Sequence, residues 1–145
     1  MSWPAPEAGL VIRYSYLWHS EHLQGRDEGV KDRPCAIIVA LRQEDGGDRV
    51  LVVPVTHSAP AEASLALEIP AVVKKRLGLD GERSWVVLAE SNVFTWPGPD
   101  LRPVSGRADG TIAYGFLPPA FFDELRRRFV ELERLRRSRQ VPRTE

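Results

Sequence analysis

The stretch RPCAIIVALRQEDGGDRVLVVPVT, residues 33–56, decides the fold class of this chain. Its first part, 34–41, is a continuous apolar run, which predicts a strand buried on both faces. A polar turn at 42–48, which contains two glycines, separates this run from a second β-branched run at 49–56. Two such runs joined by a short turn predict an antiparallel β-hairpin.

The open end of this hairpin carries polar residues. With this turn, residue 33 lies opposite residue 57 or close to it, so Arg33 and Thr56 are expected to be neighbours. A guanidinium is a fixed fork of donors that matches a phosphate, and a threonine hydroxyl adds another donor. A surface salt bridge of Arg33 with Asp32 and Glu28 explains the same residues equally well. The sequence alone leaves both interpretations open.

Apolar or alternating runs elsewhere predict further strands. They are expected at 9–18, at 65–69 and, with or without a bulge, at 84–96. The segment 111–117 is either a last strand or an irregular lead-in to the C-terminal helix. The polar segment between the first strand and the hairpin, 19–33, is expected to be a surface loop. These short strands predict a small barrel-like antiparallel sheet with a helix packed against it.

Two helices are predicted in the second half of the chain. Pro70 and Gly78 are typical start and stop signals of a short helix. From Phe122 onward, apolar residues recur every three or four positions, which predicts an amphipathic C-terminal helix at about 119–139. The last residues, 141–145, are expected to fray.

The composition limits the class of protein. A chain of 145 residues is expected to form one domain, residues 1–145, with a single core. Lys and Arg together number 20, as do Asp and Glu, which argues against a nucleic-acid coat protein but allows a local cationic cleft. No apolar run reaches the roughly 18 residues of a membrane span, and no signal peptide is visible. A cytoplasmic protein without a membrane partner is therefore expected.

Few residues are candidates for metal binding or nucleophilic catalysis. Cys35 is the only cysteine and stands inside the apolar run, so it is expected to be a core residue. His19 and His22 are either metal ligands or solvated loop residues, and the lack of a third ligand group favours the second interpretation. His57 follows Thr56 at a strand end, where functional sites are often built. No metal is expected, because one cysteine cannot build a multi-thiolate site and the histidines lack a third ligand group. No nucleotide cofactor is expected either, because the sequence has no phosphate-binding glycine motif.

Several motifs in order resemble one known family. EGVKDRP at 28–34 precedes the apolar strand, VPVTHS at 53–58 closes the next strand, and GLDGERSWVVLAESNVFTW at 78–96 follows the short helix. Together with GLVIRY at 9–14, this order resembles the MazF/PemK family of toxin endoribonucleases from toxin–antitoxin systems. The resemblance extends from about Gly9 into the C-terminal helix.

This resemblance implies a fold, an activity and partners. The expected fold is an SH3-like small barrel, mainly β with helices, that forms a homodimer. The expected activity is metal-independent cleavage of single-stranded RNA, in which the ribose 2′-hydroxyl is the nucleophile and the products carry 2′,3′-cyclic phosphate and 5′-hydroxyl ends. A cognate antitoxin protein would cover the site.

The family's site residues correspond to particular positions here. Arg33 would serve in acid–base transfer and stabilise the charged transition state, and Thr56 would hydrogen-bond the scissile phosphate. Glu28 corresponds to the acidic residue that precedes the Arg-Pro step. Three flanking residues are expected to contact RNA; they are Arg26, Lys31 and Ser58. His57 is a candidate proton carrier on grounds independent of the family, since an arginine is a poor general base.

The sequence also departs from the family. The loop before the Arg-Pro step is longer, and Glu90-Ser91 stands where the family commonly has Asp-Gln. An alternative is therefore a non-catalytic binding module on the same SH3-like fold that inhibits a protein target such as a topoisomerase. A third hypothesis is nucleic-acid binding by the arginine-rich helix, although Glu131 and Glu133 interleave its arginines and favour a solvated face.

Overall fold

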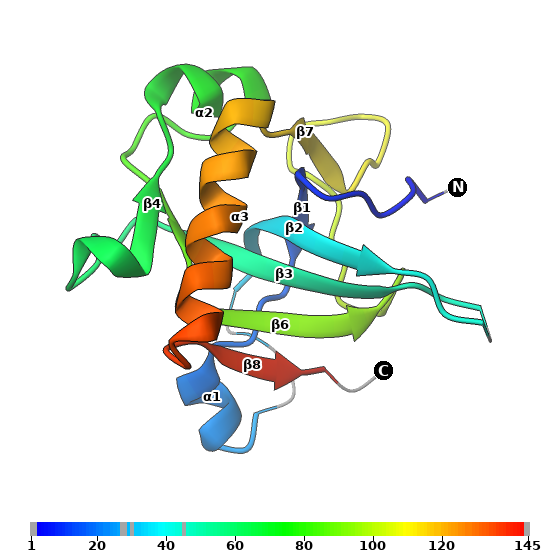
Figure 1. Ribbon diagram of the computed structural model, residues 1–145. Helices are drawn as coiled ribbons and strands as arrows, with labels where there is room; N and C mark the ends of the chain where they lie inside the picture. The colour runs from blue at the N-terminus through cyan, green and yellow to red at the C-terminus, as the bar shows by residue number, and fades with distance from the viewer. Residues whose placement is uncertain (1–2, 27–28, 30, 45, 144–145) are drawn as a thin grey trace.

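The computed structural model describes residues 3–26, 29, 31–44 and 46–143. Within this part of the chain, eight strands form a mainly antiparallel sheet, accompanied by a long C-terminal helix and shorter helices (Figure 1). The elements are β1 (Leu10–Tyr14), α1 (His19–Leu23), β2 (Arg33–Leu41), β3 (Arg49–Thr56), the 3-10 turn η1 (Ala63–Leu65), β4 (Ala66–Glu68), α2 (Ala71–Leu77), β5 (Trp85–Val87), β6 (Glu90–Thr95), β7 (Ala113–Phe116), α3 (Pro119–Arg134) and β8 (Arg139–Pro142). No helix among the described residues combines the length and apolarity needed to cross a membrane.

The predicted hairpin is confirmed as β2 and β3. The two strands pair antiparallel, with Cys35 opposite Pro54 and Ile37 opposite Val52. If this register is continued by two residues, Arg33 falls opposite Thr56, as the sequence suggested. The strand is buried on both faces only over residues 35–38, and Val39 and Leu41 beyond them are exposed.

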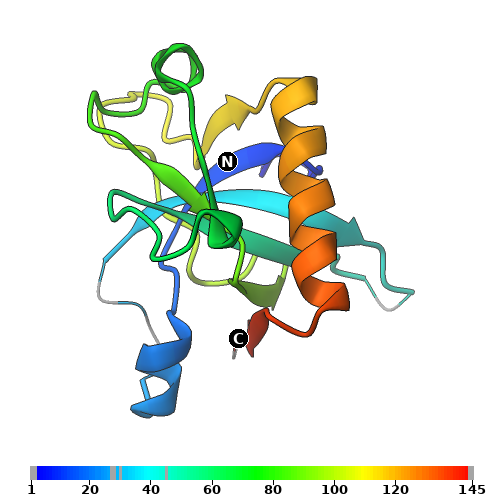
Figure 2. The ribbon, with the colours of Figure 1, turned by 60° about the vertical axis from the view of Figure 1, so that its left-hand side comes forward.

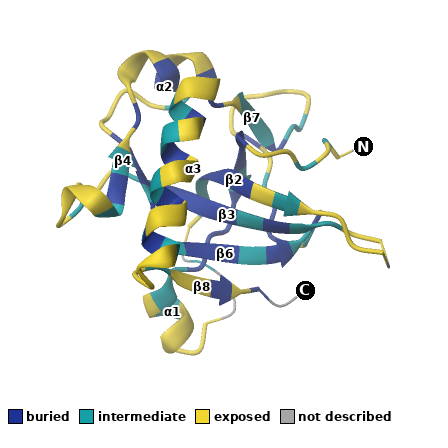
Figure 3. Ribbon diagram, viewed as in Figure 1, coloured by how far each residue is buried: buried dark blue, intermediate teal, exposed yellow. Residues whose placement is uncertain are grey.

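Two core clusters lie on opposite faces of this hairpin. Alternate residues of β2 supply them: Ala36 and Ile38 face one cluster, and Cys35 and Ile37 face the other. The first cluster is covered by α3, which lies along one side of the sheet in both ribbon views (Figures 1 and 2). Figure 3 shows that α3 buries the face toward the sheet and exposes the opposite face. The amphipathic helix predicted from the sequence therefore covers the core.

β3 belongs to two parts of the sheet at once. Its first half, Arg49–Val52, pairs with β6, whereas Val55 and Thr56 pair with β5. Buried Pro54 lies between these two segments and has no N–H to offer a neighbour. The prediction of a single strand at 84–96 is therefore wrong. This segment is divided into β5 and β6, because each of them pairs with a different half of β3.

Three other expectations need correction. The predicted loop 19–33 contains a short helix, α1, in which Glu21 accepts the backbone N–H of Trp18. The C-terminal helix ends at Arg134 instead of near residue 139, because Arg136 adopts a left-handed conformation (φ 57°). The chain then forms β8, parallel to β6, so the described part of the segment expected to fray is paired and partly buried.

Candidate functional site

A cleft of about 650 Å³ opens where the hairpin strands end. The start of β2, the end of β3 and the turn after α2 form its walls. The residues that matter for its chemistry are Trp18, Arg33, Thr56, His57 and Asp80. The cleft thus brings together side chains from segments far apart in the sequence.

Arg33 is held at the start of β2 by contacts that include no acidic side chain among the described residues. Its guanidinium carbon lies 4.9 Å from the centroid of the Trp18 ring, and its Nη1 donates to the Val55 carbonyl at 3.3 Å. Its Nε is buried and has no hydrogen-bond partner among the described residues. The guanidinium is therefore oriented by a ring and a carbonyl, and retains donors for an anionic ligand.

The salt bridge expected as the alternative for Arg33 is not formed with Asp32. Asp32 instead lies 3.8 Å from Arg13 and 3.6 Å from Arg102, both measured between side-chain nitrogen and oxygen. Glu28, the other candidate partner and candidate catalytic residue, lies outside the described residues. The pairing of Asp32 elsewhere favours a ligand-binding interpretation of Arg33.

Thr56 ends β3 with its hydroxyl at the cleft. The Thr56 Oγ1 accepts the backbone N–H of Ser58 at 3.2 Å, which fixes the turn that carries His57. A hydroxyl that accepts this bond still has its own proton to donate. Arg33 and Thr56 therefore present donors from adjacent strands to one space.

The predicted RNA-contacting residues are divided between the cleft and the outer surface. Lys31 and Ser58 line the cleft and are exposed. Arg26 is exposed and, within the part of the chain that the structure describes, is not among the cleft residues. Of the three, only Lys31 adds a positive charge to the cleft.

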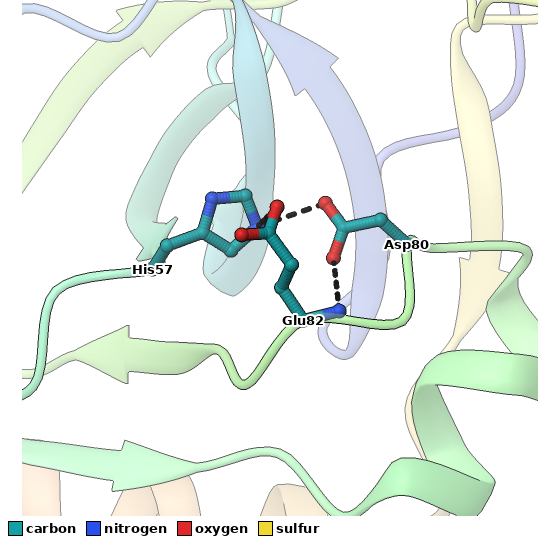
Figure 4. A group of neighbouring side chains, drawn as sticks. All are labelled: His57, Asp80 and Glu82. Atoms are coloured by element: carbon teal, nitrogen blue, oxygen red, sulfur yellow. Dashed lines mark hydrogen bonds and ion pairs between the residues drawn. The ribbon is translucent and has the colours of Figure 1, made fainter.

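On the opposite wall, His57 contacts two acidic residues (Figure 4). Its Nε2 lies 2.8 Å from Asp80 Oδ2 and 3.8 Å from Glu82 Oε2. The pKa of Asp80 is below its ordinary value. Burial acts in the opposite direction, but it is outweighed by hydrogen bonds from Lys74, from His57 and from the backbone N–H of Glu82. Asp80 is thus a stable anion beside the imidazole.

The same three side chains are the group among the described residues that offers a metal three donors. The donor atoms of His57, Asp80 and Glu82 lie within 4.8 Å of one another. However, the Lys74 ammonium already lies 2.7 Å from Asp80 Oδ1, and its charge opposes a second cation on that carboxylate. The three side chains are also exposed, so the cluster suits a positioned imidazole better than a metal centre.

The other sequence candidates lie away from the chemistry. Cys35 is fully buried, and burial raises the pKa of its thiol well above the ordinary value, which confirms a core residue. His19 and His22 lie on α1 instead of in a loop. No third potential ligand within the described ranges gathers with these two histidines.

The arginine-rich face of α3 is largely neutralised by neighbouring acids. Arg127 and Arg128 both pair with Glu124, and Arg134 pairs with Glu131. These i,i+3 and i,i+4 pairs are the ordinary arrangement of a solvated helix face. They leave less free positive charge for a nucleic acid than the sequence suggests.

Sequence reasoning missed Trp18, Lys74 and Asp80. Trp18 was the last residue of the segment interpreted as the first strand, whereas it precedes the short helix α1, and this position brings its ring over Arg33. Lys74 and Asp80 lie on either side of Gly78, which ends α2. Gly78 predicted the end of the helix but gave no indication that Lys74 and Asp80 form an ion pair across it. The Asp80-Gly81 step is a typical turn signal, and it could have indicated that the Asp80 side chain lies at the surface beside the strand ends.

No protein-family model matches the chain, and no curated protein shows significant sequence similarity to it. The case for a function therefore rests on the residues of the cleft and on the order of motifs around them.

Proposed function

We propose that this chain is a MazF/PemK-like toxin endoribonuclease that cleaves single-stranded RNA without a metal or another cofactor. The observation that carries the proposal is Arg33, which lines the cleft with a buried Nε that has no partner among the described residues. A buried donor without an acceptor is costly in free energy, and a phosphate oxygen is an acceptor of suitable charge. Thr56, from the adjacent strand, offers a second donor to the same phosphate.

The chemistry suits such a site because the nucleophile is supplied by the RNA. The 2′-hydroxyl attacks the adjacent phosphorus, so the protein must position the phosphate and stabilise charge instead of forming a covalent intermediate. Arg33 holds the negative charge that develops on the non-bridging oxygens, and Thr56 fixes the phosphate. The products are 2′,3′-cyclic phosphate and 5′-hydroxyl ends.

The proposal includes the finer fold and the partners. The antiparallel sheet with its covering helix is proposed to be an SH3-like small barrel of the MazF type, acting as a cytoplasmic homodimer. The partner is a cognate antitoxin, whose acidic segment would occupy the cleft beside Arg33 and Lys31. Sequestration of these two charges would block access of RNA to the site.

Cleavage of a mixed single-stranded RNA in the presence of EDTA tests the activity. The wild-type protein is expected to cleave and to leave cyclic phosphate ends, and Arg33→Ala is expected to be about 10²- to 10³-fold slower, because one main source of charge stabilisation is lost. Thr56→Val, which keeps the side-chain shape, is expected to be slowed as well. Arg134→Ala removes an equal charge from α3, outside the cleft, and is expected to cleave at the wild-type rate.

Two outcomes would contradict the proposal. One is no cleavage by the wild-type protein; the other is equal cleavage by wild type and Arg33→Ala. Growth arrest that persists in the Arg33→Ala, Thr56→Val double variant would instead favour the non-catalytic inhibitor of a protein target.

A further inference from the structure

Lys74 is a buried cation with an evident structural task. Its side chain is only 6% exposed although it belongs to the short helix α2. The ammonium donates to Asp80 Oδ1 at 2.7 Å, to Ser84 Oγ at 2.7 Å and to the carbonyl of Glu82. These acceptors use its three protons, so Lys74 is fixed in place and cannot turn toward a ligand.

Asp80 is fixed in turn and presents one oxygen to His57. Its Oδ1 accepts from Lys74 and from the backbone N–H of Glu82 at 3.1 Å. Its Oδ2 lies 2.8 Å from His57 Nε2 (Figure 4). Since an ionised carboxylate only accepts hydrogen bonds, Nε2 must be the nitrogen that carries the proton. In the neutral imidazole, Nδ1 is then the nitrogen with a free lone pair.

The imidazole stands where RNA cleavage needs a base. His57 directly follows Thr56, lines the same cleft as Arg33, and has a half-exposed side chain. No described residue hydrogen-bonds its Nδ1. A guanidinium stays protonated at neutral pH, so Arg33 can hold charge but is a poor acceptor of the 2′-hydroxyl proton. Among the described residues of the cleft, the carboxylates of Asp32 and Asp80 are already engaged by arginines and by Lys74, so His57 is the group best placed to accept a proton.

We propose that His57 is the proton-accepting catalytic residue of this cleft, and that Asp80 and Lys74 are its positioning residues. The proposal rests on the proposed ribonuclease function and adds a chain of three residues, Lys74–Asp80–His57, that the family resemblance does not supply. Asp80 sets the tautomer and orientation of the imidazole and stabilises the imidazolium that forms. Lys74 holds Asp80 in its ionised, correctly turned state.

The step balances without a further reactant. His57 Nδ1 takes the proton of the ribose 2′-hydroxyl while the 2′-oxygen forms a bond to phosphorus. The bond between phosphorus and the 5′-oxygen breaks, and its electron pair leaves on that oxygen, which takes a proton from water. The imidazolium returns its proton to the resulting hydroxide, so the enzyme is restored and the water is regenerated.

Imidazole rescue of His57→Ala is the first test. The variant is expected to lose about 10²- to 10⁴-fold in kcat, the usual contribution of a general base, and to regain activity when free imidazole is added. Arg33→Ala, assayed beside it, is expected to show no rescue. His57→Ala leaves the Lys74–Asp80 pair intact, so the fold is expected to be kept. Cleavage by His57→Ala at the wild-type rate would overturn the proposal.

A double-mutant cycle tests the positioning role. Asp80→Asn is expected to lower kcat at least about tenfold with little change in KM, since the imidazole loses its orienting charge. In the His57→Ala background the same change is expected to have no further effect on kcat, because its target is gone. Equal losses in both backgrounds would mean that Asp80 acts only through structure and would overturn the positioning claim.

Glu62→Gln is the control. It removes an exposed carboxylate that pairs with Arg137 at 2.6 Å and does not line the cleft, and it is expected to leave kcat and KM unchanged. Failures of the two proposals are distinguishable in this set. Cleavage that needs Arg33 but not His57 overturns the proton-transfer role alone, whereas a wild-type protein that cleaves no RNA overturns both.

Discussion

Arg33 shows how one residue can be structurally costly and functionally suited. Stacking on Trp18 contributes of the order of 0.5–1 kcal/mol, and Nη1 also donates to the Val55 carbonyl, whereas a buried donor such as Nε, which has no partner among the described residues, costs about 1–3 kcal/mol. Under the proposed function, an anionic ligand supplies the missing acceptor. Pro34 keeps the residue extended and places the fork at the strand end. Under the proposed function, Trp18 and Pro34 orient the guanidinium before an anion binds.

Glu90 is a partly buried carboxyl group whose effect on stability is expected to depend on pH. Burial raises the pKa of this carboxyl, although Tyr16 O–H and the His19 N–H both donate to its Oε1. A raised folded-state pKa means that the unfolded chain ionises first as the pH increases. The contribution of Glu90 to stability is therefore complete below its ordinary pKa of 4.5 and is lost as the pH rises through the raised value.

Glu90→Gln removes this titration and retains an oxygen acceptor. We expect its unfolding free energy, relative to wild type, to increase between pH 4 and pH 7 as the wild-type carboxylate becomes ionised in a half-buried site. Urea unfolding of both proteins across this range measures the difference. A difference that stays constant with pH would contradict the assignment of Glu90 as a titrating buried acid.

At the scale of elements, the sequence was informative wherever local rules acted alone. The hairpin, the short helix and the start of α3 were predictable, because apolar runs, Pro70 and Gly78 act over a few residues. The division of 84–96 into two strands was not, because it follows from the two partners of β3. The adjacency of Arg33 and Thr56 was predictable from the hairpin, whereas Asp80 beside His57 depends on tertiary packing.

The end of α2 offers an element-scale prediction. Gly78 caps the helix with φ 71°, a left-handed conformation that costs other residues about 1–2 kcal/mol. A Cβ here would meet Arg107 at an ordinary 3.6 Å, so Gly78→Ala is expected to lose about 1 kcal/mol through backbone strain alone. Chemical denaturation measures the loss.

Gly81→Ala is the matched control, because a Cβ at that position meets nothing within 4 Å and the backbone does not require a positive φ. It is expected to change the unfolding free energy much less than Gly78→Ala. Equal losses at the two glycines would argue that the whole turn 78–81 is sensitive to substitution, and not the helix cap in particular.

At the scale of the whole molecule, the C-terminal segment supports the loop that leads into the cleft. Arg143 Nη1 donates to the carbonyl of Ser15 at 2.6 Å and to Asn92 Oδ1 at 3.0 Å. The Asn92 side chain also brackets the backbone of Leu17, accepting its N–H and donating to its carbonyl. Trp18, which stacks on Arg33, comes next. The chain end and the cleft are therefore connected through buried hydrogen bonds.

Arg143 also forms a buried ion pair with Asp100. Its Nη2 lies 2.8 Å from Asp100 Oδ2, and the two side chains are 1% and 8% exposed. Removal of one partner from a buried pair leaves the other charge without compensation and costs about 3–5 kcal/mol. Arg102, 3.7 Å from Asp100, softens this loss, so we expect Arg143→Met to lower the unfolding free energy by about 3 kcal/mol. Arg139→Met changes an exposed arginine of β8, which ends just before Arg143, and is expected to change the unfolding free energy by less than about 0.5 kcal/mol. Urea denaturation compares the two variants. Equal, small losses would show that the C-terminal segment is peripheral to stability, whereas the expected contrast would mean that the fold that carries the cleft is stabilised by a segment remote from the cleft in sequence.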